Sequence, residues 1–270
     1  MPEQNIYEKM DTFAGNLKLD FSGKELAVIA SDHHYTEDQL AAIGEVFDYL
    51  SNKKHETVIN TLLKMSRLPT KEPKTFEGYD FTRLHGDDLQ ALKSLPALSD
   101  VNAGRNIAFV GPAGVGKTHL AEAYGRECCR RGMKTYFLKA SELNDRFTIA
   151  RNFGREARTI QSLVKPTCLI IDEIGRCKFS RDNTAMFFDL IDRRYEKEGP
   201  HTIIFTSNKQ PNEWAQYFEG KDDLMCSLDR IFDRASIFDI KGDSYRGQSC
   251  TTYAVEAGKV LAPETETSKQ

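Results

Sequence analysis

The chain has 270 residues, of which 40% are hydrophobic and 29% are charged, as in ordinary soluble globular proteins. This length accommodates one sizeable core, or one domain with a small helical appendage. The formal net charge of -3 provides no overall basic field for nucleic acid, so a DNA-binding role has to rest on local patches. No apolar run approaches the ~20 residues that a membrane span requires, and the first residues lack the pattern of a signal peptide.

The six cysteines contain no CxxC pair, and no histidine lies at zinc-ligand spacing from them. This pattern is typical of reduced cysteines in a cytosolic protein. We therefore expect a cytoplasmic protein that has no membrane partner.

A helical module is predicted at the N-terminus, over residues 1–68. Thr36 and Gln39 have the spacing of a capping box, and apolar residues follow at helical intervals from Leu40 to Leu50. A second, short amphipathic stretch covers residues 58–63. Residues 1–75 contain nine Lys or Arg and twelve Asp or Glu, which favours docking to a protein over binding to DNA. A helical cap on the main domain is the alternative interpretation.

Pro69 and Pro73 bracket a polar stretch, which predicts a linker and lead-in segment over residues 69–105. Beyond it, five short apolar runs alternate with helical patterns. The runs are Asn106–Val110, Thr135–Leu138, Cys168–Ile171, Thr202–Thr206 and Ser236–Ile240. Such runs predict an α/β domain over residues 106–250, with a five-stranded parallel sheet covered by helices on both faces. The tail over residues 251–270, which contains the polar run PETETS at 263–268, is expected to be disordered.

A phosphate-binding loop follows the first of these strands. Residues 111–118 fit the GxxxxGK[ST] pattern of P-loop NTPases, with a strand before them and a helix from about Lys117. The glycines allow backbone N–H groups to turn inward around phosphate, and the helix N-terminus adds its positive dipole end. Lys117 is expected to reach the β- and γ-phosphates of ATP, and Thr118 to bind Mg²⁺. The predicted cofactor-binding residues are Gly111, Pro112, Ala113, Gly114, Val115, Gly116, Lys117, Thr118 and His119.

Two acidic residues, Asp172 and Glu173, follow the apolar run at 168–171. They are expected at the carboxyl edge of the sheet, where ligands of open α/β sheets bind. Asp172 is suited to hold Mg²⁺, and Glu173 is suited to act as the general base toward the attacking water. Asn208 closes another apolar run and is expected beside Glu173, where it would orient that water or sense the γ-phosphate. A simple helix cap before Pro211 is the alternative for this segment.

Several segments of the chain resemble a known family. They are GPAGVGKTHLAEAYG at 111–125, LIIDEIG at 169–175, FFDLIDRRYE at 187–196, IIFTSN at 203–208, LDRIFDR at 228–234 and IKGDSYR at 240–246. They resemble IstB, the ATPase helper of an insertion-sequence transposase, and its relative DnaC, the bacterial helicase loader. Both belong to the initiator-related branch of AAA+ ATPases. The resemblance covers about residues 67–247, its lead-in KTFEGYDF at 74–81 included, and the RRYE, SNK and NEW pattern favours IstB.

The resemblance implies an AAA+ ATPase that assembles as a homo-oligomeric ring or helical filament. Arg230 matches the arginine that projects as a finger into the ATP site of a neighbouring subunit. Arg246 matches the second sensor, which contacts the γ-phosphate. Arg193, Arg194 and Arg234 are competing candidates for the finger.

A group of arginines follows the second predicted strand, at Arg146, Arg151, Arg155 and Arg158. The last three are spaced i, i+4 and i+7, so they share one face if the segment is one helix. In the initiator branch this segment lines the surface that holds DNA. The resemblance therefore implies contacts with duplex DNA that tolerate many sequences. An ordinary charged helix face is the alternative.

These observations predict a Mg²⁺-dependent ATPase that assembles on DNA and recruits or regulates a transposase through its N-terminal helices. A helicase loader of the DnaC type, acting in DNA replication, is the alternative, because the two families differ in what the N-terminal helices bind. A metabolic P-loop kinase would need an acceptor-binding lid, for which the sequence has no counterpart. A nucleotide switch that never hydrolyses ATP has no need of Glu173.

Overall fold

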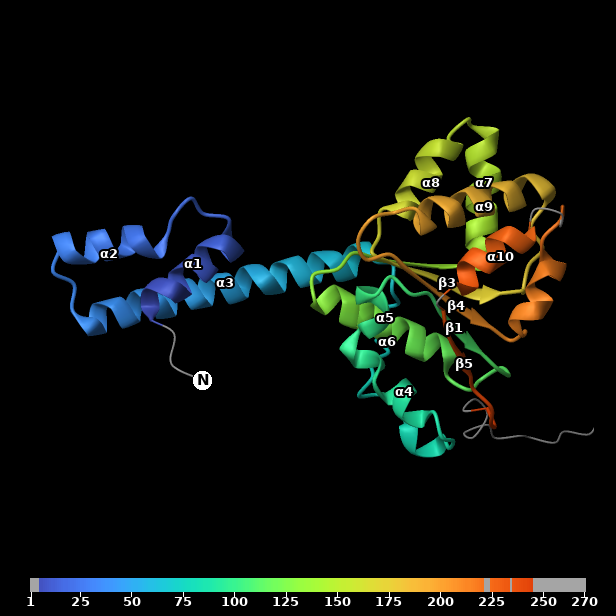
Figure 1. Cartoon of the computed structure of the whole chain (residues 1–270), viewed down its shortest axis with the longest axis horizontal. Coiled ribbons are helices and arrows are strands. Elements are labelled where there is room, and N and C mark those ends of the chain that lie inside the picture. The colour runs from blue at the N-terminus through green and yellow to red at the C-terminus, as the bar shows by residue number, and fades with distance from the viewer. Residues whose placement is uncertain (1–4, 221–223, 234, 245–270) are drawn as a thin grey trace, which may run out of the picture.

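The computed structural model describes residues 5–220, 224–233 and 235–244. A helical N-terminal part is joined by one long helix to an α/β part (Figure 1). The helices are α1 Ile6–Leu17, α2 Gly23–Asp32, α3 Glu37–Met65, α4 Leu89–Lys93, α5 Ser99–Asn102, α6 Lys117–Arg130, α7 Ala140–Asn152, α8 Glu156–Val164, α9 Arg181–Tyr195 and α10 Leu224–Phe232. The strands are β1 Ile107–Val110, β2 Thr135–Lys139, β3 Cys168–Ile174, β4 Thr202–Ser207 and β5 Ser236–Asp239. The predicted tail at 251–270 lies outside the described residues.

The N-terminal part consists of α1 and α2 with the first half of α3. The capping box predicted at the start of α3 is present: the Gln39 N–H donates to Thr36 Oγ1 (3.3 Å), and the Thr36 N–H donates to Gln39 Oε1 (2.8 Å). The two predicted amphipathic stretches, over 40–50 and 58–63, belong to one helix, because α3 continues unbroken for 29 residues. The polar residues between the two apolar stretches contain neither proline nor glycine, so nothing in them ends the helix.

All five strands of the sheet are parallel, in the order β2-β3-β4-β1-β5. Helices cover both faces (Figure 1), with α6 on one side and α7, α8 and α9 on the other. Each layer has its own apolar core, in which Leu120 and Tyr124 of α6 pack on one face and Phe147 and Leu190 on the other. The predicted five-stranded α/β fold is therefore confirmed. No helix among the described residues combines the length and the apolar character needed to cross a bilayer.

A buried arginine, Arg194 of α9, ties the second helical layer to the sheet. Only 1% of its surface is exposed, and its guanidinium donates to the carbonyls of Leu163, Val164, Pro166 and Thr202 at 2.9–3.2 Å. These carbonyls lie at the end of α8, before β3 and at the start of β4. The guanidinium thus supplies donors to carbonyls at the end of α8, which lack an intrahelical partner, and to carbonyls that flank the starts of β3 and β4.

We predict that Arg194→Met lowers the free energy of unfolding by about 3 kcal/mol, because a hydrogen bond to a charged group contributes ~1.5–3 kcal/mol and several carbonyls lose theirs together. Urea denaturation followed by the fluorescence of Trp214, the single tryptophan, measures this change, since Trp214 is 1% exposed in the same core. Arg193→Met is the matched control. Its guanidinium is exposed and bonds Asp189 on its own helix, so a change within about 0.5 kcal/mol is expected. Equal losses for the two variants would contradict the role assigned to Arg194.

Candidate nucleotide site

The phosphate-binding loop lies between β1 and α6, at the carboxyl edge of the sheet. Two of its glycines are required by geometry as well as by backbone conformation. Gly111 has a φ of +141°, and a Cβ there would lie 2.0 Å from the carbonyl oxygen of Ile240. Gly116, directly before α6, has a φ of +90°, and a Cβ would lie 2.6 Å from the Tyr79 ring. The loop can therefore pass close to β5 and to the lead-in segment only with glycine at these positions.

Lys117 opens α6 and is 7% exposed. Its ammonium donates to the carbonyl oxygens of Gly111 (2.9 Å) and Pro112 (2.6 Å), so it lies inside the curve of the loop. A positive charge in this position, at the N-terminus of a helix, is suited to the phosphates of a nucleotide.

A buried carboxylate, Asp172 at the end of β3, connects the loop helix to the neighbouring strand. It is 2% exposed, and its Oδ1 accepts from the hydroxyls of Thr118 (2.8 Å) and Thr206 (2.5 Å). A hydroxyl beside a carboxylate is the hard oxygen set that Mg²⁺ prefers. The two residues predicted as metal ligands, Thr118 and Asp172, are thus brought together by the fold, and the donors fit the ion.

Glu173 follows Asp172 in an irregular stretch of β3, where the register with β4 shifts between Ile171 and Ile174. Its φ is +60°, and its N–H donates to Thr206 Oγ1 (2.9 Å). The Glu173 carboxylate forms ion pairs with Arg176 (2.5 Å) and Lys139 (3.5 Å). This left-handed residue interrupts the alternation of the strand, so that Asp172 and Glu173 both remain at the edge that faces the loop.

A cavity of about 410 Å³ opens at this edge. Of the predicted site residues, its wall contains Ala113, Gly114, Gly116, Lys117, Thr118, His119, Glu173 and Asn208. Val115 points away into the core and is 1% exposed. Asn208 lies directly after β4 and is not the cap of the next helical turn, since that cap is Gln210. The predicted neighbourhood of Asn208 and Glu173 is therefore present.

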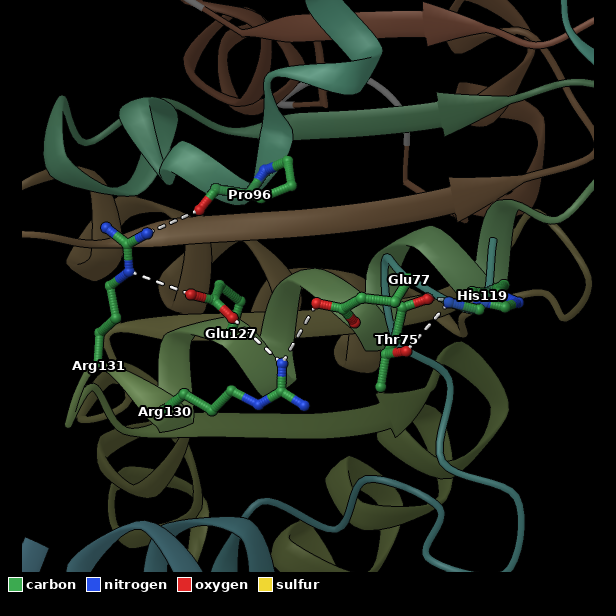
Figure 2. A network of polar contacts seen from close by, with 8 residues as sticks. Thr75, Glu77, Pro96, His119, Glu127, Arg130 and Arg131 are labelled. Atoms are coloured by element: carbon green, nitrogen blue, oxygen red, sulfur yellow. Dashed lines mark hydrogen bonds and ion pairs between the residues drawn. The ribbon is translucent and has the colours of Figure 1, made fainter. Parts of the chain in front are cut away.

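The lead-in segment supplies another wall of the cavity, through Lys74, Gly78, Tyr79 and Asp80. The Nε2–H of His119 donates to the carbonyl of Thr75 (2.8 Å), and burial lowers the pKa of this histidine. Figure 2 shows how the other end of α6 holds the same segment: Arg130 contacts both Glu77 (3.9 Å) and Glu127 (3.5 Å). The sequence analysis predicted residues 69–105 as a linker and lead-in segment and gave them no role in the site, whereas residues 74–80 contribute directly to it. The aromatic residues of KTFEGYDF could have indicated that this segment packs against the ATPase domain.

Glu122 is a second wall residue that the sequence analysis missed. It lies one helical turn after Thr118, and it is 6% exposed. Burial raises its pKa to about 7, and the nearby Asp172 adds to this effect, whereas Arg126 and Lys74 oppose it. No sequence motif marks the position, because its character depends on what packs around it.

Arg230 lies on α10, at the opposite edge of the sheet from the loop. It pairs with Asp192 (2.5 Å) and lines a pocket with Asn106 and His201, which precede β1 and β4. About 13 Å, the length of a four-residue strand, separates these two edges. Arg230 therefore cannot reach the nucleotide cavity of its own chain.

Of the competing arginines, Arg194 is excluded as a finger because it is buried in the core. Arg193 is exposed and bonded to Asp189. Arg234 and Arg246, the proposed second sensor, lie outside the described residues.

The predicted single stripe of arginines is wrong. The segment is two helices, α7 and α8, because Phe153 ends α7 and Gly154 adopts a φ of +61° between them. Arg151 lies in the last turn of α7, Arg155 is the N-cap of α8, and Arg158 lies within α8. The i, i+4, i+7 spacing therefore does not describe one helix face.

The four arginines also differ in their contacts. Arg146 donates to the Tyr136 hydroxyl (2.7 Å), and Arg151 bonds Asp182 across to α9. Arg155 and Arg158 are exposed, and the Arg155 guanidinium lies over the ring of Phe153, which is 67% exposed. The outer surface of the α7–α8 elbow thus carries two arginines and an aromatic ring.

The comparison with known protein families agrees with this geometry. A family profile described as IstB-like ATP binding protein matches residues 16–252. The chain belongs to this family. It is 39% identical over 194 residues to the "Insertion sequence IS5376 putative ATP-binding protein" of Geobacillus stearothermophilus, covering 72% of this chain and 75% of the relative. It is 36% identical over 195 residues to the "Insertion sequence IS21 putative ATP-binding protein" of Pseudomonas aeruginosa, covering 72% of each.

Solved structures show the same fold at low sequence identity. AMPPCP-bound DnaA from Aquifex aeolicus matches with a TM-score of 0.52 and 21% identity, over 66% of this chain and about half (52%) of that chain. The DnaI structure matches with a TM-score of 0.52 and 20% identity, over 62% of this chain and 90% of that chain. The fold is therefore that of an AAA+ P-loop NTPase, as the sequence predicted, in a family of ATP-binding proteins.

We predict that Lys117→Ala weakens ATP binding by at least about 10-fold, because hydrogen bonds to charged groups contribute ~1.5–3 kcal/mol. Titration with a fluorescent ATP analogue measures the affinity. Lys165→Ala removes an exposed lysine between α8 and β3, and it should bind as the wild type does. Unchanged affinity in Lys117→Ala would show that the nucleotide binds elsewhere.

Proposed function

We propose that this protein is a Mg²⁺-dependent ATPase that assembles on DNA and recruits a transposase. The observation that carries the hydrolytic part is the arrangement of Lys117, Thr118 and Glu173 around one cavity, with Asp172 hydrogen-bonded to Thr118 behind its wall. Lys117 would bind the phosphates, and Thr118 and Asp172 would hold Mg²⁺, which when bound neutralises charge on the phosphate oxygens. Glu173 would accept the proton of the attacking water, and Asn208 would orient that water. Release of Glu173 from Arg176 and Lys139 would accompany this step.

The proposed active site is completed by a second copy of the chain. Charge that builds on the γ-phosphate needs a further cation, and an arginine in this role accelerates hydrolysis roughly 10³–10⁵-fold. Arg230 lies at the edge of the sheet opposite to its own cavity, which suits action toward a neighbour. A head-to-tail contact of this kind generates a ring or a helical filament.

The α7–α8 elbow is the proposed DNA contact. Arg155 and Arg158 extend from it into solvent, where they can follow a phosphate backbone without reading bases. Arg146 and Arg151 are already engaged with Tyr136 and with Asp182, so they are expected to support the elbow as much as to contact DNA.

The N-terminal helices are the proposed docking site for the partner. Val28, Val46 and Tyr49 are each at least 57% exposed there, and such apolar exposure is typical of protein interaction surfaces. The relatives are ATP-binding proteins of insertion sequences by name, which favours a transposase as the partner. A replicative helicase, as for the DnaC family, is the second candidate, and the fold is common to both.

We predict that two inactive variants restore activity when they are mixed. Arg230→Ala lacks the finger, and Glu173→Gln lacks the base, whose loss typically costs ~10²–10⁴-fold. In an equal mixture with random exchange, about a quarter of the interfaces join an intact Glu173 to an intact Arg230 from the neighbour. The rate of phosphate release should therefore approach about a quarter of the wild-type rate.

The control is Arg193→Ala, which removes an exposed arginine of α9 and should keep wild-type activity by itself. If mixing restores nothing, and the wild-type rate per molecule is independent of protein concentration, Arg230 does not act on a neighbour.

We predict that the double variant Arg155→Glu, Arg158→Glu binds duplex DNA of any sequence more weakly than the wild type. The slope of log affinity against log salt should become shallower by about 2, since two phosphate contacts are lost. Fluorescence anisotropy with an ATP analogue present, at several salt concentrations, measures both quantities. The control Arg193→Glu reverses one charge away from the elbow. Equal weakening by the control would indicate a general charge effect and no DNA path over α7 and α8.

A further inference from the structure

Glu122 is the one buried carboxylate of the cavity wall for which the proposed chemistry gives no task. It is 6% exposed, and it lies on the same side of α6 as Thr118, one helical turn further on. Its Oε2 is sealed from solvent and has no hydrogen-bond partner among the described residues. A buried carboxylate without a partner lowers the stability of the folded state. We therefore expect a ligand that provides the missing hydrogen bond.

The neighbouring cations do not satisfy this carboxylate. Arg126, one turn further along α6, donates to the carbonyl of Pro69, and Lys74 pairs with the exposed Glu72 (3.4 Å). Within the described part of the chain, no ion pair joins Glu122 to either side chain at 4.0 Å or less. Among the described residues Glu122 therefore forms no direct ion pair with the lead-in segment, and Arg126 and Lys74 act on its charge only from a longer distance.

The surroundings indicate what kind of ligand Glu122 takes. Glu122 lines the same cavity as Thr118, which is bonded to Asp172, and Asp172 is close enough to affect the charge of Glu122. A third acid beside a triphosphate would be repelled unless a cation lay between them. Mg²⁺ usually keeps several of its waters when it binds protein carboxylates and phosphates. A carboxylate that does not touch the ion can accept a hydrogen bond from such a water.

We propose that Glu122 is a positioning residue for the metal, and that its carboxylate accepts a hydrogen bond from a water of the Mg²⁺ held by Thr118 and Asp172. This inference rests on the proposed Mg²⁺–ATP site and adds an outer carboxylate to it. Rotation about the last bond of the side chain presents either oxygen to the cavity, since this torsion has a broad energy well. Loss of a residue that bonds to a metal ligand, without touching the metal itself, typically lowers metal affinity by about 10–100-fold.

The test measures how strongly Mg²⁺ tightens nucleotide binding. The dissociation constant of a fluorescent, non-hydrolysable ATP analogue is determined in EDTA and in saturating Mg²⁺, and the ratio of the two values is the tightening factor. For Glu122→Gln and for Glu122→Ala we expect this factor to fall by about 10-fold or more, with the affinity in EDTA unchanged or higher. Glu127→Gln, on the same helix but bonded to Arg130 and Arg131 away from the cavity, should keep the wild-type factor.

Urea denaturation followed by Trp214 separates this role from a structural one. Removal of an unpaired buried acid should leave the unfolding midpoint unchanged or higher. A lower midpoint together with a wild-type tightening factor would assign Glu122 to the fold and overturn the proposal. Equal weakening in EDTA and in Mg²⁺ would mean that Glu122 contacts the nucleotide itself, which also overturns it. If Mg²⁺ does not change the nucleotide affinity of the wild type, the proposed Mg²⁺ site itself is wrong, and this inference fails with it.

Discussion

The structure of the candidate site depends on one buried carboxylate, that of Asp172. Its Oδ1 accepts hydrogen bonds from Thr118 of α6 and from Thr206 of β4, and the Thr206 hydroxyl in turn accepts from the N–H of Glu173. A buried carboxylate is tolerated only where donors or cations compensate it. The start of the phosphate-binding helix, the acid pair and the end of β4 are therefore held in one arrangement, and the proposed base is fixed relative to the loop.

The parallel sheet has a further consequence for catalysis. Because all strands run in one direction, their carboxyl ends form the nucleotide cavity, whereas the segments that enter β1, β4 and β5 lie at the other edge. Arg230 precedes β5 and so belongs to that other edge. Within one chain the proposed finger and the proposed base are kept apart, and only a neighbouring copy can bring them together. In the proposed mechanism the fold thereby links hydrolysis to assembly of the protein on DNA.

The loop, the acid pair and the five strands could be predicted from sequence, since each depends on a local pattern: glycines before Lys117, or an apolar run that ends in Asp172. Other features depend on contacts between distant segments. The burial of Glu122 requires the lead-in segment to pack across α6, and the core position of Arg194 requires carbonyls from the end of α8 and its connection to β3 and from the start of β4. The elbow at Gly154 was missed because the arginine spacing around it also fits a continuous helix. Periodicity describes one element at a time and cannot show which side chain another element covers.

The most direct measurement of the central claim is a structure of the protein assembled on duplex DNA with a non-hydrolysable ATP analogue, determined by electron microscopy. The account predicts a head-to-tail ring or filament in which Arg230 of one copy has left Asp192 and contacts the γ-phosphate in the cavity of the next copy. It also predicts DNA along the α7–α8 elbow of each copy. Copies that bind DNA singly, or that meet through other faces while Arg230 stays paired with Asp192, would contradict it.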